Sequence, residues 1–397
     1  MEDSRQRAQE KISRLAGSGL DLVDFWLSCS AVLADAVPHY QAPCWFTVDP
    51  ATLLMTSHFQ QGLPEFPAEW AAAEYAGDDV NRICDVARSP SGISTLHEAT
   101  DGDPSRSPRW HANMAYGGDQ EMIVSLRSRS GQIWGSLGLY REPHRPLFSD
   151  DEKTFVRAVS PILADGARRA LLVGEATDPE SPDAPGLVVL DTDWRPESFS
   201  PGVERWLHDL PDGDWYRGRL PPAVLAVAGQ AFRTARGVAG PAEVAVSRVL
   251  SKSGIWVVLH AVPMTATSND RIAVIVEPAH PARITPLLMS AYALTEREQE
   301  LTRLVLQGFS TTEIAQQLTI SSHTVQQHLK SVFCKTGVRS RRDLVTKVFL
   351  AHYEPRLRDN EHRVGEQRPV RGGPYPVRST SDACHQEADR TGRRTVY

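Results

Sequence analysis

The sequence has little cysteine and no long apolar run. Its five cysteines are far apart, without a C-x-x-C pair or a Cys/His cluster. This spacing predicts neither a disulfide framework nor a structural zinc site, and it favours a reducing, cytoplasmic setting. No run of about 18 apolar residues occurs, so no membrane span or membrane partner is expected. The charged start MEDSRQRAQEKISR also lacks the apolar region of a signal peptide.

Motifs of catalysis and nucleotide binding are missing as well. The sequence contains no G-x-x-x-x-G-K-[ST], no G-x-S-x-G, no paired His/Asp/Glu motif and no metal-ligand spacing. An ATP-driven protein and a hydrolase of the common types are therefore excluded. We expect a protein that is not an enzyme and that needs no cofactor.

The negative charge is unevenly distributed. The whole chain carries a net charge of −6, but residues 1–287 hold 26 Lys and Arg against 37 Asp and Glu. Residues 288–352 hold 8 against 5, and residues 353–397 hold 9 against 7. This separation is expected if only the C-terminal part approaches phosphate groups.

Residues 294–350 contain three helix starts in quick succession. Thr295 precedes Glu298 by three residues, Ser310 precedes Glu313 in the same way, and Ser340 precedes Asp343. In such a capping box the hydroxyl accepts a free backbone N–H and the acid reaches back to the cap. The spacing predicts a compact bundle of short helices.

Two of these helices have the proportions of a helix-turn-helix. Segments 311–318 and 322–336 are joined by only three residues. The second segment has a buried stripe at helical spacing and an opposite face without a carboxylate. That face suits phosphates and base edges, although a polar helix face is more often simply solvated. The stripe is Val325, Leu329, Val332 and Phe333, and the polar face is His323, Gln326, Gln327 and Lys330.

The whole C-terminal run resembles the LuxR-type helix-turn-helix of bacterial transcription regulators. The pattern is LT-x-RE, a glycine, S-x-x-EIA-x-x-L-x-IS-x-x-TV-x-x-HL and K-x-GV-x-SR. It is carried by Leu294-Thr295, Arg297-Glu298, Gly308, Ser310, Glu313-Ile314-Ala315, Leu318, Ile320-Ser321, Thr324-Val325, His328-Leu329, Lys335, Gly337-Val338 and Ser340-Arg341. The resemblance implies a four-helix module whose third helix enters the major groove.

The resemblance also implies roles for single residues. Base contacts would fall on Gln326, Gln327 and Lys330. One departure is Gln326, because the family often has lysine there; glutamine pairs with adenine, whereas lysine favours guanine. Contacts with the DNA backbone would come from Thr312, Ser322, Thr324, His328 and Lys335, and the last helix would form a dimer through Leu344, Val345, Val348 and Phe349.

Residues 1–174 are expected to form one α+β domain. The pattern predicts a helix over residues 4–37, a hairpin around Asp49-Pro50, a long surface loop at 89–119 and a further strand pair before a helix capped at Ser149. The stretch from Trp134 to Leu171 resembles the end of a GAF domain, a family that often holds a small ligand. Aromatic residues of such a domain line a pocket or fill its core, here Trp45, Trp110 and Trp134.

The rest of the chain divides into four further parts. Residues 175–185 are acidic and proline-bearing and read as a linker, and residues 186–279 resemble a PAS-like domain. A stiff connector at 278–286 then leads to the LuxR-type domain at 288–353, with its helix-turn-helix at 311–330. Residues 354–397 are expected to be a disordered basic tail.

Taken together, we expect a multidomain cytoplasmic regulator of transcription. Two α+β sensory domains, GAF-like and then PAS-like, would gate an all-α DNA-binding domain. Its expected partners are double-stranded DNA, a second copy of the chain, a small-molecule effector and RNA polymerase. No receiver-domain pattern or acyl-homoserine-lactone receptor pattern is evident. The alternative is a non-catalytic signalling adaptor that uses the same domains for protein contacts.

Overall fold

The fold is described from a computed structural model, over residues 2–62, 68–75, 77, 79–172, 185–240, 243–264, 271–279, 281–346 and 365. Contacts within the chain divide it into two compact units. The first holds residues 1–173, 184–250 and 257–277, and the second holds 174–183, 251–256 and 278–397. Each unit is described by itself. The expected linker at 175–185 and the expected tail at 354–397 lie almost wholly outside the described residues.

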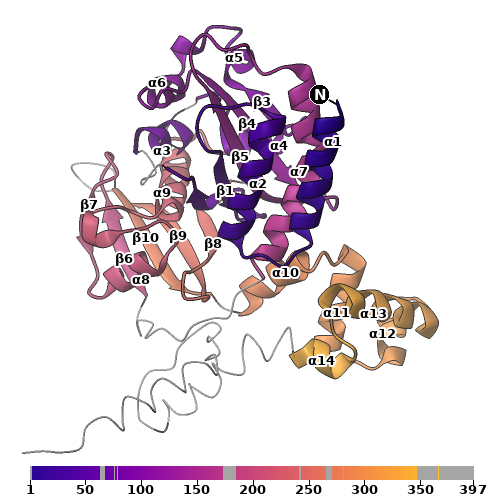
Figure 1. The fold of residues 1–397 in the computed structure, drawn as a ribbon. Coiled ribbons are helices and arrows are strands. Elements are labelled where there is room, and N and C mark those ends of the chain that lie inside the picture. The colour runs from indigo at the N-terminus through magenta and orange to yellow at the C-terminus, as the bar shows by residue number, and fades with distance from the viewer. Residues whose placement is uncertain are drawn as a thin grey trace, which may run out of the picture. The chain divides into compact units, whose positions relative to one another are not determined.

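The N-terminal α+β region contains two antiparallel five-stranded sheets (Figure 1). Their strand orders are β2-β1-β5-β4-β3 and β7-β6-β10-β9-β8, so both have the same topology. In each sheet a hairpin is joined to a three-stranded meander, because the first strand also pairs with the last. The first sheet consists of Cys44–Val48 (β1), Met55–Phe59 (β2), Ile93–Thr95 (β3), Gln120–Arg127 (β4) and Ile133–Arg141 (β5). The second consists of Gly186–Leu190 (β6), Pro196–Phe199 (β7), Val246–Leu250 (β8), Trp256–Met264 (β9) and Arg271–Pro278 (β10).

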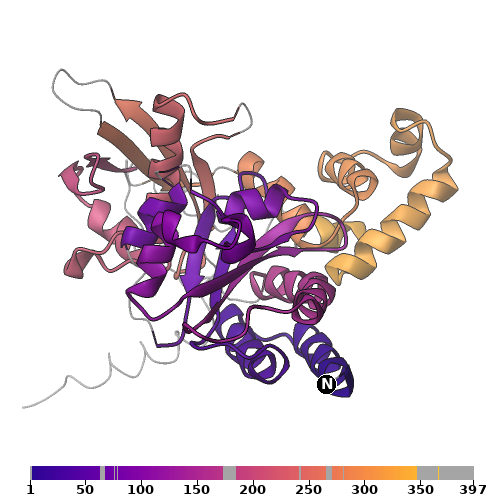
Figure 2. The same cartoon turned by 90° about the horizontal axis from the view of Figure 1, so that it is seen from above.

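One face of the first sheet is covered by Glu2–Ala16 (α1), Leu22–Ala36 (α2) and Asp150–Ala170 (α7). In Figure 2 the indigo helices and the magenta helix lie together on one side of the purple strands. Alternate strand residues point toward these helices, as the period of a strand requires. They form one apolar core with the helices, which includes Trp26, Trp45, Met122, Val124, Leu137, Val159 and Leu163.

The single helix expected over residues 4–37 is wrong. The chain turns at 17–19 and forms the packed pair α1 and α2. α1 ends at Ala16, and Gly19 in the following turn has φ of +74°, a conformation that side-chain-bearing residues rarely adopt. Asp21 then starts α2 by accepting the N–H of Asp24 at 2.9 Å. The turn lets both helices bury an apolar face.

The surface loop expected at 89–119 is also wrong, because this stretch contains β3, Leu96–Ala99 (α5), Pro104–Arg106 (a 3-10 turn) and Pro108–Met114 (α6). Its polar residues are caps rather than signs of a loop. Thr95 accepts the N–H of Glu98, and Ser107 accepts the N–H of Trp110. Ala68–Tyr75 (α3) and Ile83–Arg88 (α4) precede α5 and α6 in the chain, and in Figure 1 α3 and α6 lie on the side of the strands away from α1 and α7.

The second sheet packs with Val203–Asp209 (α8), Trp215–Arg217 (a 3-10 turn) and Pro222–Ala235 (α9). Strand β9, which lies between the central strand β10 and the edge strand β8, is buried from Trp256 to Leu259. The two sheet domains are joined by polar contacts and close packing. Asp49, only 1% exposed, accepts the backbone N–H of Arg248 at 2.9 Å and its guanidinium at 2.8 and 2.5 Å. Gly229 of α9 lies so close to Tyr75 of α3 that a side chain would overlap it.

The second unit is a helical bundle. It contains Pro281–Ala291 (α10), Glu296–Leu306 (α11), Thr311–Gln317 (α12), Ser322–Thr336 (α13) and Arg341–Val345 (α14). The stiff connector expected at 278–286 is wrong, because α10 begins within it. Pro281 occupies the first helical position, where the missing N–H has no cost, and Met289 joins the bundle core.

Removal of the Arg248 side chain should weaken the N-terminal unit. In Arg248→Met the Asp49 carboxylate stays buried without its cation, which lowers the free energy of unfolding by about 3 kcal/mol. Urea unfolding followed by tryptophan fluorescence measures this. Arg205→Met, on the exposed side of α8, is the matched control. The double variant Asp49→Asn/Arg248→Met should recover much of the loss; equal midpoints for Arg248→Met and the control would contradict this account.

Candidate functional sites

The turn between α12 and α13 is built to hold the two helices close together. Thr319 has a left-handed φ of +54°, and Ile320 donates its N–H to the Ala315 carbonyl at 3.0 Å. Ser321 then starts α13 by accepting the N–H of Thr324 at 3.0 Å. Ala315 is buried, so its small side chain permits the close approach. The helix-turn-helix expected at 311–330 is present.

One face of α13 is open and the other is buried. Val325, Leu329 and Val332 are buried in the bundle core, as the sequence predicts. The three residues expected to contact bases are all exposed, and α13 contains no Asp or Glu. Among these residues, Gln327 is hydrogen-bonded to His323 through Nε2 at 2.9 Å. Gln326 and Lys330 extend from the same face.

The residues expected to contact the DNA backbone differ in their accessibility. Thr312 and Ser322 are exposed, whereas Thr324 and His328 are half-buried. The hydroxyl of Thr324 is hydrogen-bonded to the hydroxyl of Ser321 at 2.8 Å. The fifth residue, Lys335, is engaged within the bundle. The backbone roles of these residues stay predictions.

Glu298 is the carboxylate that engages Lys335. It is buried at the start of α11, where it accepts the N–H of Thr295 at 2.8 Å in the expected capping box. It also accepts hydrogen bonds from Ser331 Oγ at 2.6 Å and from Lys335 Nζ at 2.6 Å, and both donors belong to α13. Burial alone would raise the pKa of Glu298, but these hydrogen bonds outweigh it and hold the pKa below its usual value. One side chain therefore fixes α13 against α11.

Two arginines position α12 in a similar way. Arg297 donates to the Leu318 carbonyl at 2.7 Å, at the end of α12. Arg341 donates to the Phe309 carbonyl at 2.8 Å and to Thr311 Oγ1 at 3.1 Å, at its start. Arg297 and Arg341 both belong to the sequence pattern of the helix-turn-helix region. Their hydrogen bonds to the two ends of α12 give these two positions a structural role.

The residues expected to form a dimer contact are only partly described. Leu344 is 0% exposed and belongs to the core of its own bundle, with Val345 half-buried beside it. The side chain of Leu344 therefore stabilises the protomer itself. Val348 and Phe349 lie outside the described residues, and dimerisation through this helix stays a prediction.

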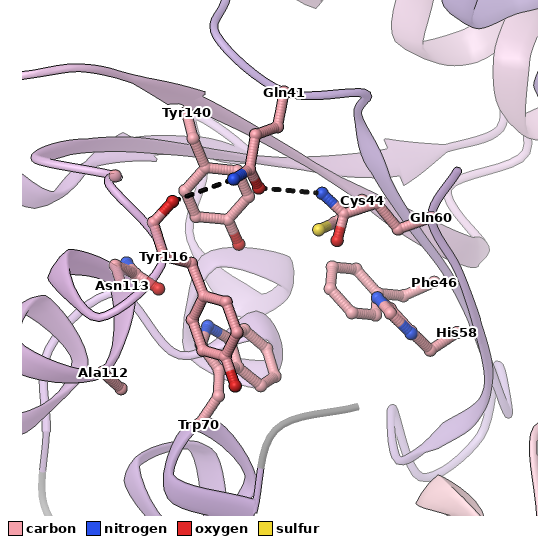
Figure 3. Close-up of a pocket in the computed structure, with 11 residues that line it drawn as sticks. Gln41, Cys44, Phe46, His58, Gln60, Trp70, Ala112, Asn113, Tyr116 and Tyr140 are labelled. Carbon is pink, nitrogen blue, oxygen red and sulfur yellow. Dashed lines mark hydrogen bonds between the residues drawn. The ribbon is translucent and has the colours of Figure 1, made fainter. Parts of the chain in front are cut away.

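A pocket with about 470 Å³ of empty space, part of it at an open mouth, lies in the first sheet domain (Figure 3). Its walls come from β1, β2, β5, α3 and the end of α6. The lining residues are Gln41, Cys44, Phe46, His58, Gln60, Trp70, Ala112, Asn113, Tyr116, Gly118 and Tyr140. None of them is an acid, a lysine or an arginine.

Burial shifts the pKa values of three groups of this pocket, His58, Cys44 and Tyr140, in the direction that favours their neutral forms. Burial lowers the pKa of His58 to about 4. Burial likewise raises the pKa of the Cys44 thiol and raises that of the Tyr140 phenol well above its usual value. The described lining of the pocket is thus aromatic and amide-bearing, without an acidic or basic side chain other than His58.

A buried charge network fixes the wall behind the pocket. Arg109, 0% exposed on α6, pairs with Glu74 of α3 and donates to Glu121 Oε1 of β4 at 3.4 Å. Asn81 and Asn113 donate to Glu121 at 2.7 and 3.3 Å. The guanidinium also lies 4.5 Å from the centre of the Trp70 ring. These contacts hold α3 and α6 against the sheet.

The three tryptophans considered for a pocket lie elsewhere. Trp45 stacks on Trp26 at 4.3 Å in the opposite core, and Trp110 donates to Asp119. Trp134 is buried and does not line the pocket. The alternation of β1 could have indicated Phe46, the neighbour of Trp45 on the other face. Trp70 lies on α3 and Tyr116 in the turn after α6, two segments whose position the sequence pattern does not fix.

Two further expectations concern absences. Within the described part of the chain no group of three His, Cys, Asp or Glu residues could hold a metal ion. Among the same residues, no helix is both long enough and apolar enough to cross a membrane.

Comparison with known proteins places the C-terminal bundle in a family. The model of the bacterial regulatory proteins of the luxR family matches residues 292–348. The spore germination protein GerE of Bacillus subtilis is 40% identical over 55 residues, which are 14% of this chain and 74% of GerE. The chain belongs to the LuxR family.

The curated relatives match only a short part of this chain. The monoamine regulon transcriptional regulator of Klebsiella aerogenes is 42% identical over 57 residues, so 14% of this chain spans a quarter of that protein. The VqmA–ligand–DNA complex of Vibrio cholera covers 42% of this chain and 82% of its own at 17% identity, with a TM-score of 0.21. That score is too low to support an inference about the chain.

The hydrogen bonds that Glu298 accepts from Thr295, Ser331 and Lys335 should make the stability of the LuxR-type domain sensitive to acid. Because the pKa of Glu298 is lower in the folded state, its stabilising contribution is present above the unfolded carboxyl pKa and is lost as pH falls through the folded value. Glu298→Gln should cost about 2 kcal/mol at neutral pH and reduce the acid sensitivity. Hydrogen exchange of α11 and α13 in the full chain measures both effects. Glu296→Gln, on the exposed side of α11, should change neither the stability nor its pH dependence. If Glu298→Gln leaves the hydrogen exchange of α11 and α13 unchanged at every pH, the stabilising role of Glu298 is contradicted.

Proposed function

We propose that this chain is a sequence-specific DNA-binding regulator of transcription. The observation that carries the proposal is the exposed face of α13 in the LuxR-type domain. This face presents amide and ammonium groups without a carboxylate, and the opposite side of the helix is packed against the bundle. A rigid helix with such a face suits the major groove, where base edges carry a distinct pattern of donors and acceptors.

Specific roles follow from the chemistry of the side chains. The amides of Gln326 and Gln327 can pair with adenine, and the ammonium of Lys330 can donate to guanine. Thr312, Ser322, Thr324 and His328 lie on or beside this face and would donate to phosphate oxygens. Lys335 would join them with the N–H groups that Glu298 leaves free, since an ammonium has three donors.

The two sheet domains are proposed to be sensory, GAF-like over residues 1–174 and PAS-like over 186–279. Their shared strand order, a hairpin joined to a three-stranded meander, supports this assignment. The pocket of the first domain would hold a small-molecule effector. Such a site would act through a coupling free energy between effector and DNA, typically about 1–3 kcal/mol.

The elements that form the pocket walls suggest how ligand binding would change the contacts with the second sheet domain. His58 on β2 lines the pocket, and its backbone N–H donates to Asp212 of the second sheet domain at 2.7 Å. Trp70 lies on α3, which packs on α9. A ligand that shifts β2 or α3 would therefore shift the contacts with the second domain.

A homodimer is proposed as the DNA-binding form, because paired half-sites about 34–36 Å apart fit a two-fold regulator. Val345, with Val348 and Phe349, would supply the apolar contact between copies. Contact with RNA polymerase is part of the proposed regulatory role.

Exchange of Gln326 for lysine should change which base is preferred. In Gln326→Lys the adenine-pairing amide is replaced by an ammonium that favours guanine, with about 1–3 kcal/mol of discrimination at one base pair. Selection of DNA from a random pool by the full chain measures the preference. Gln307→Lys adds the same charge at the exposed end of α11 and should leave the preference unchanged. The assignment is wrong if both variants select the same sequence as the unchanged protein.

A further inference from the structure

We infer that the pocket of the first sheet domain binds a small, uncharged, planar molecule that carries an N–H or O–H donor. This inference rests on the proposed sensory role of that pocket and gives its ligand a chemical class. Three features carry it: the absence of charged side chains from the lining, the aromatic walls and one unpaired amide oxygen.

The lining disfavours a charged ligand. A buried ion without a partner of opposite charge is costly, and the described residues that line the pocket include neither a carboxylate nor a cationic side chain. The nearest buried ions are those of the Arg109 network, and they are already paired with each other. Because the Arg109 guanidinium lies on the Trp70 ring, a cationic ligand close to that ring would be repelled by the like charge.

The shape of the walls favours a flat ligand. The rings of Phe46 and Trp70 are nearly parallel, with centroids 5.4 Å apart and planes at 9°. These two rings therefore stack on each other, and Figure 3 shows them with the rings of Tyr116 and Tyr140 around the pocket. Aromatic walls of this kind gain most from offset stacking or edge contacts with another ring.

Gln60 supplies the specific contact. Its side chain is 8% exposed and lines the pocket. Its amide nitrogen donates to the Ala42 carbonyl at 2.9 Å and to Gln41 Oε1 at 3.4 Å, which fixes the orientation of the amide. Its oxygen Oε1 is buried without a hydrogen-bond partner among the described residues. Such an unpaired acceptor is costly, and a ligand donor would satisfy it.

Indole is a suitable probe, because it is planar and neutral and has a single N–H. Its affinity for the full chain is measured by ligand-observed NMR beside benzofuran, which has the same shape without the donor. Indole-3-carboxylate and tryptamine supply a negative and a positive charge. Indole should bind about five- to tenfold more tightly than benzofuran, as one buried hydrogen bond predicts. Both charged analogues should bind more weakly than indole.

Two variants locate the binding. Gln60→Met keeps the volume of the side chain and removes the amide, so indole should fall to the affinity of benzofuran. Gln61→Met, at the exposed neighbouring position, should preserve the difference. The inference is overturned if indole does not bind, if a charged analogue binds better, or if Gln60→Met leaves indole unaffected. No DNA is present in this experiment, so its failure would leave the DNA-binding proposal to be judged separately.

Discussion

The carboxylate of Glu298 is the interaction on which the proposed DNA-binding face depends. It accepts the backbone N–H of Thr295 at the start of α11, and it also accepts hydrogen bonds from Ser331 and Lys335 of α13. The orientation of α13 is therefore set by a buried, charge-assisted contact as well as by apolar packing, and such contacts are shorter and stronger than neutral hydrogen bonds. Gln326, Gln327 and Lys330 can present a defined pattern only because the opposite side of their helix is held in this way.

Buried charge also organises the N-terminal unit. Arg109 and its carboxylates hold α3 and α6 against the first sheet, and the pocket lies in front of them. Asp49 and Arg248 join the two sheet domains at the β1–β2 turn. Buried ion pairs add little stability by themselves but strongly disfavour arrangements that separate the partners. The same strand, β2, takes part in the pocket and in the contact with the second domain, which gives the sensory proposal a physical route.

The sequence predicted most of the C-terminal bundle because its signals there are local. Thr295, Ser310 and Ser321 cap the helices that follow them, and Val325 and Leu329 show the helical period directly. The prediction failed where the decisive partner is distant in the chain. The orientation of the Gln60 amide is set by its hydrogen bond to the Ala42 carbonyl, and Trp70 stacks on Phe46. No local sequence pattern reveals either contact. At 89–119 the caps Thr95 and Ser107 cannot be distinguished from loop residues by sequence, because capping residues and loop residues are the same types.

Capture of genomic DNA by the full chain tests the central claim most directly. The unchanged protein is compared with the variant Gln326→Ala/Gln327→Ala/Lys330→Ala and with the control Arg303→Ala/Gln307→Ala on the exposed part of α11, at two salt concentrations. The account predicts one shared, enriched inverted repeat for the unchanged protein and the control, and its loss in the triple variant. Equal enrichment by all three proteins, or no enriched sequence with any of them, would contradict the account; the second result would favour a signalling adaptor.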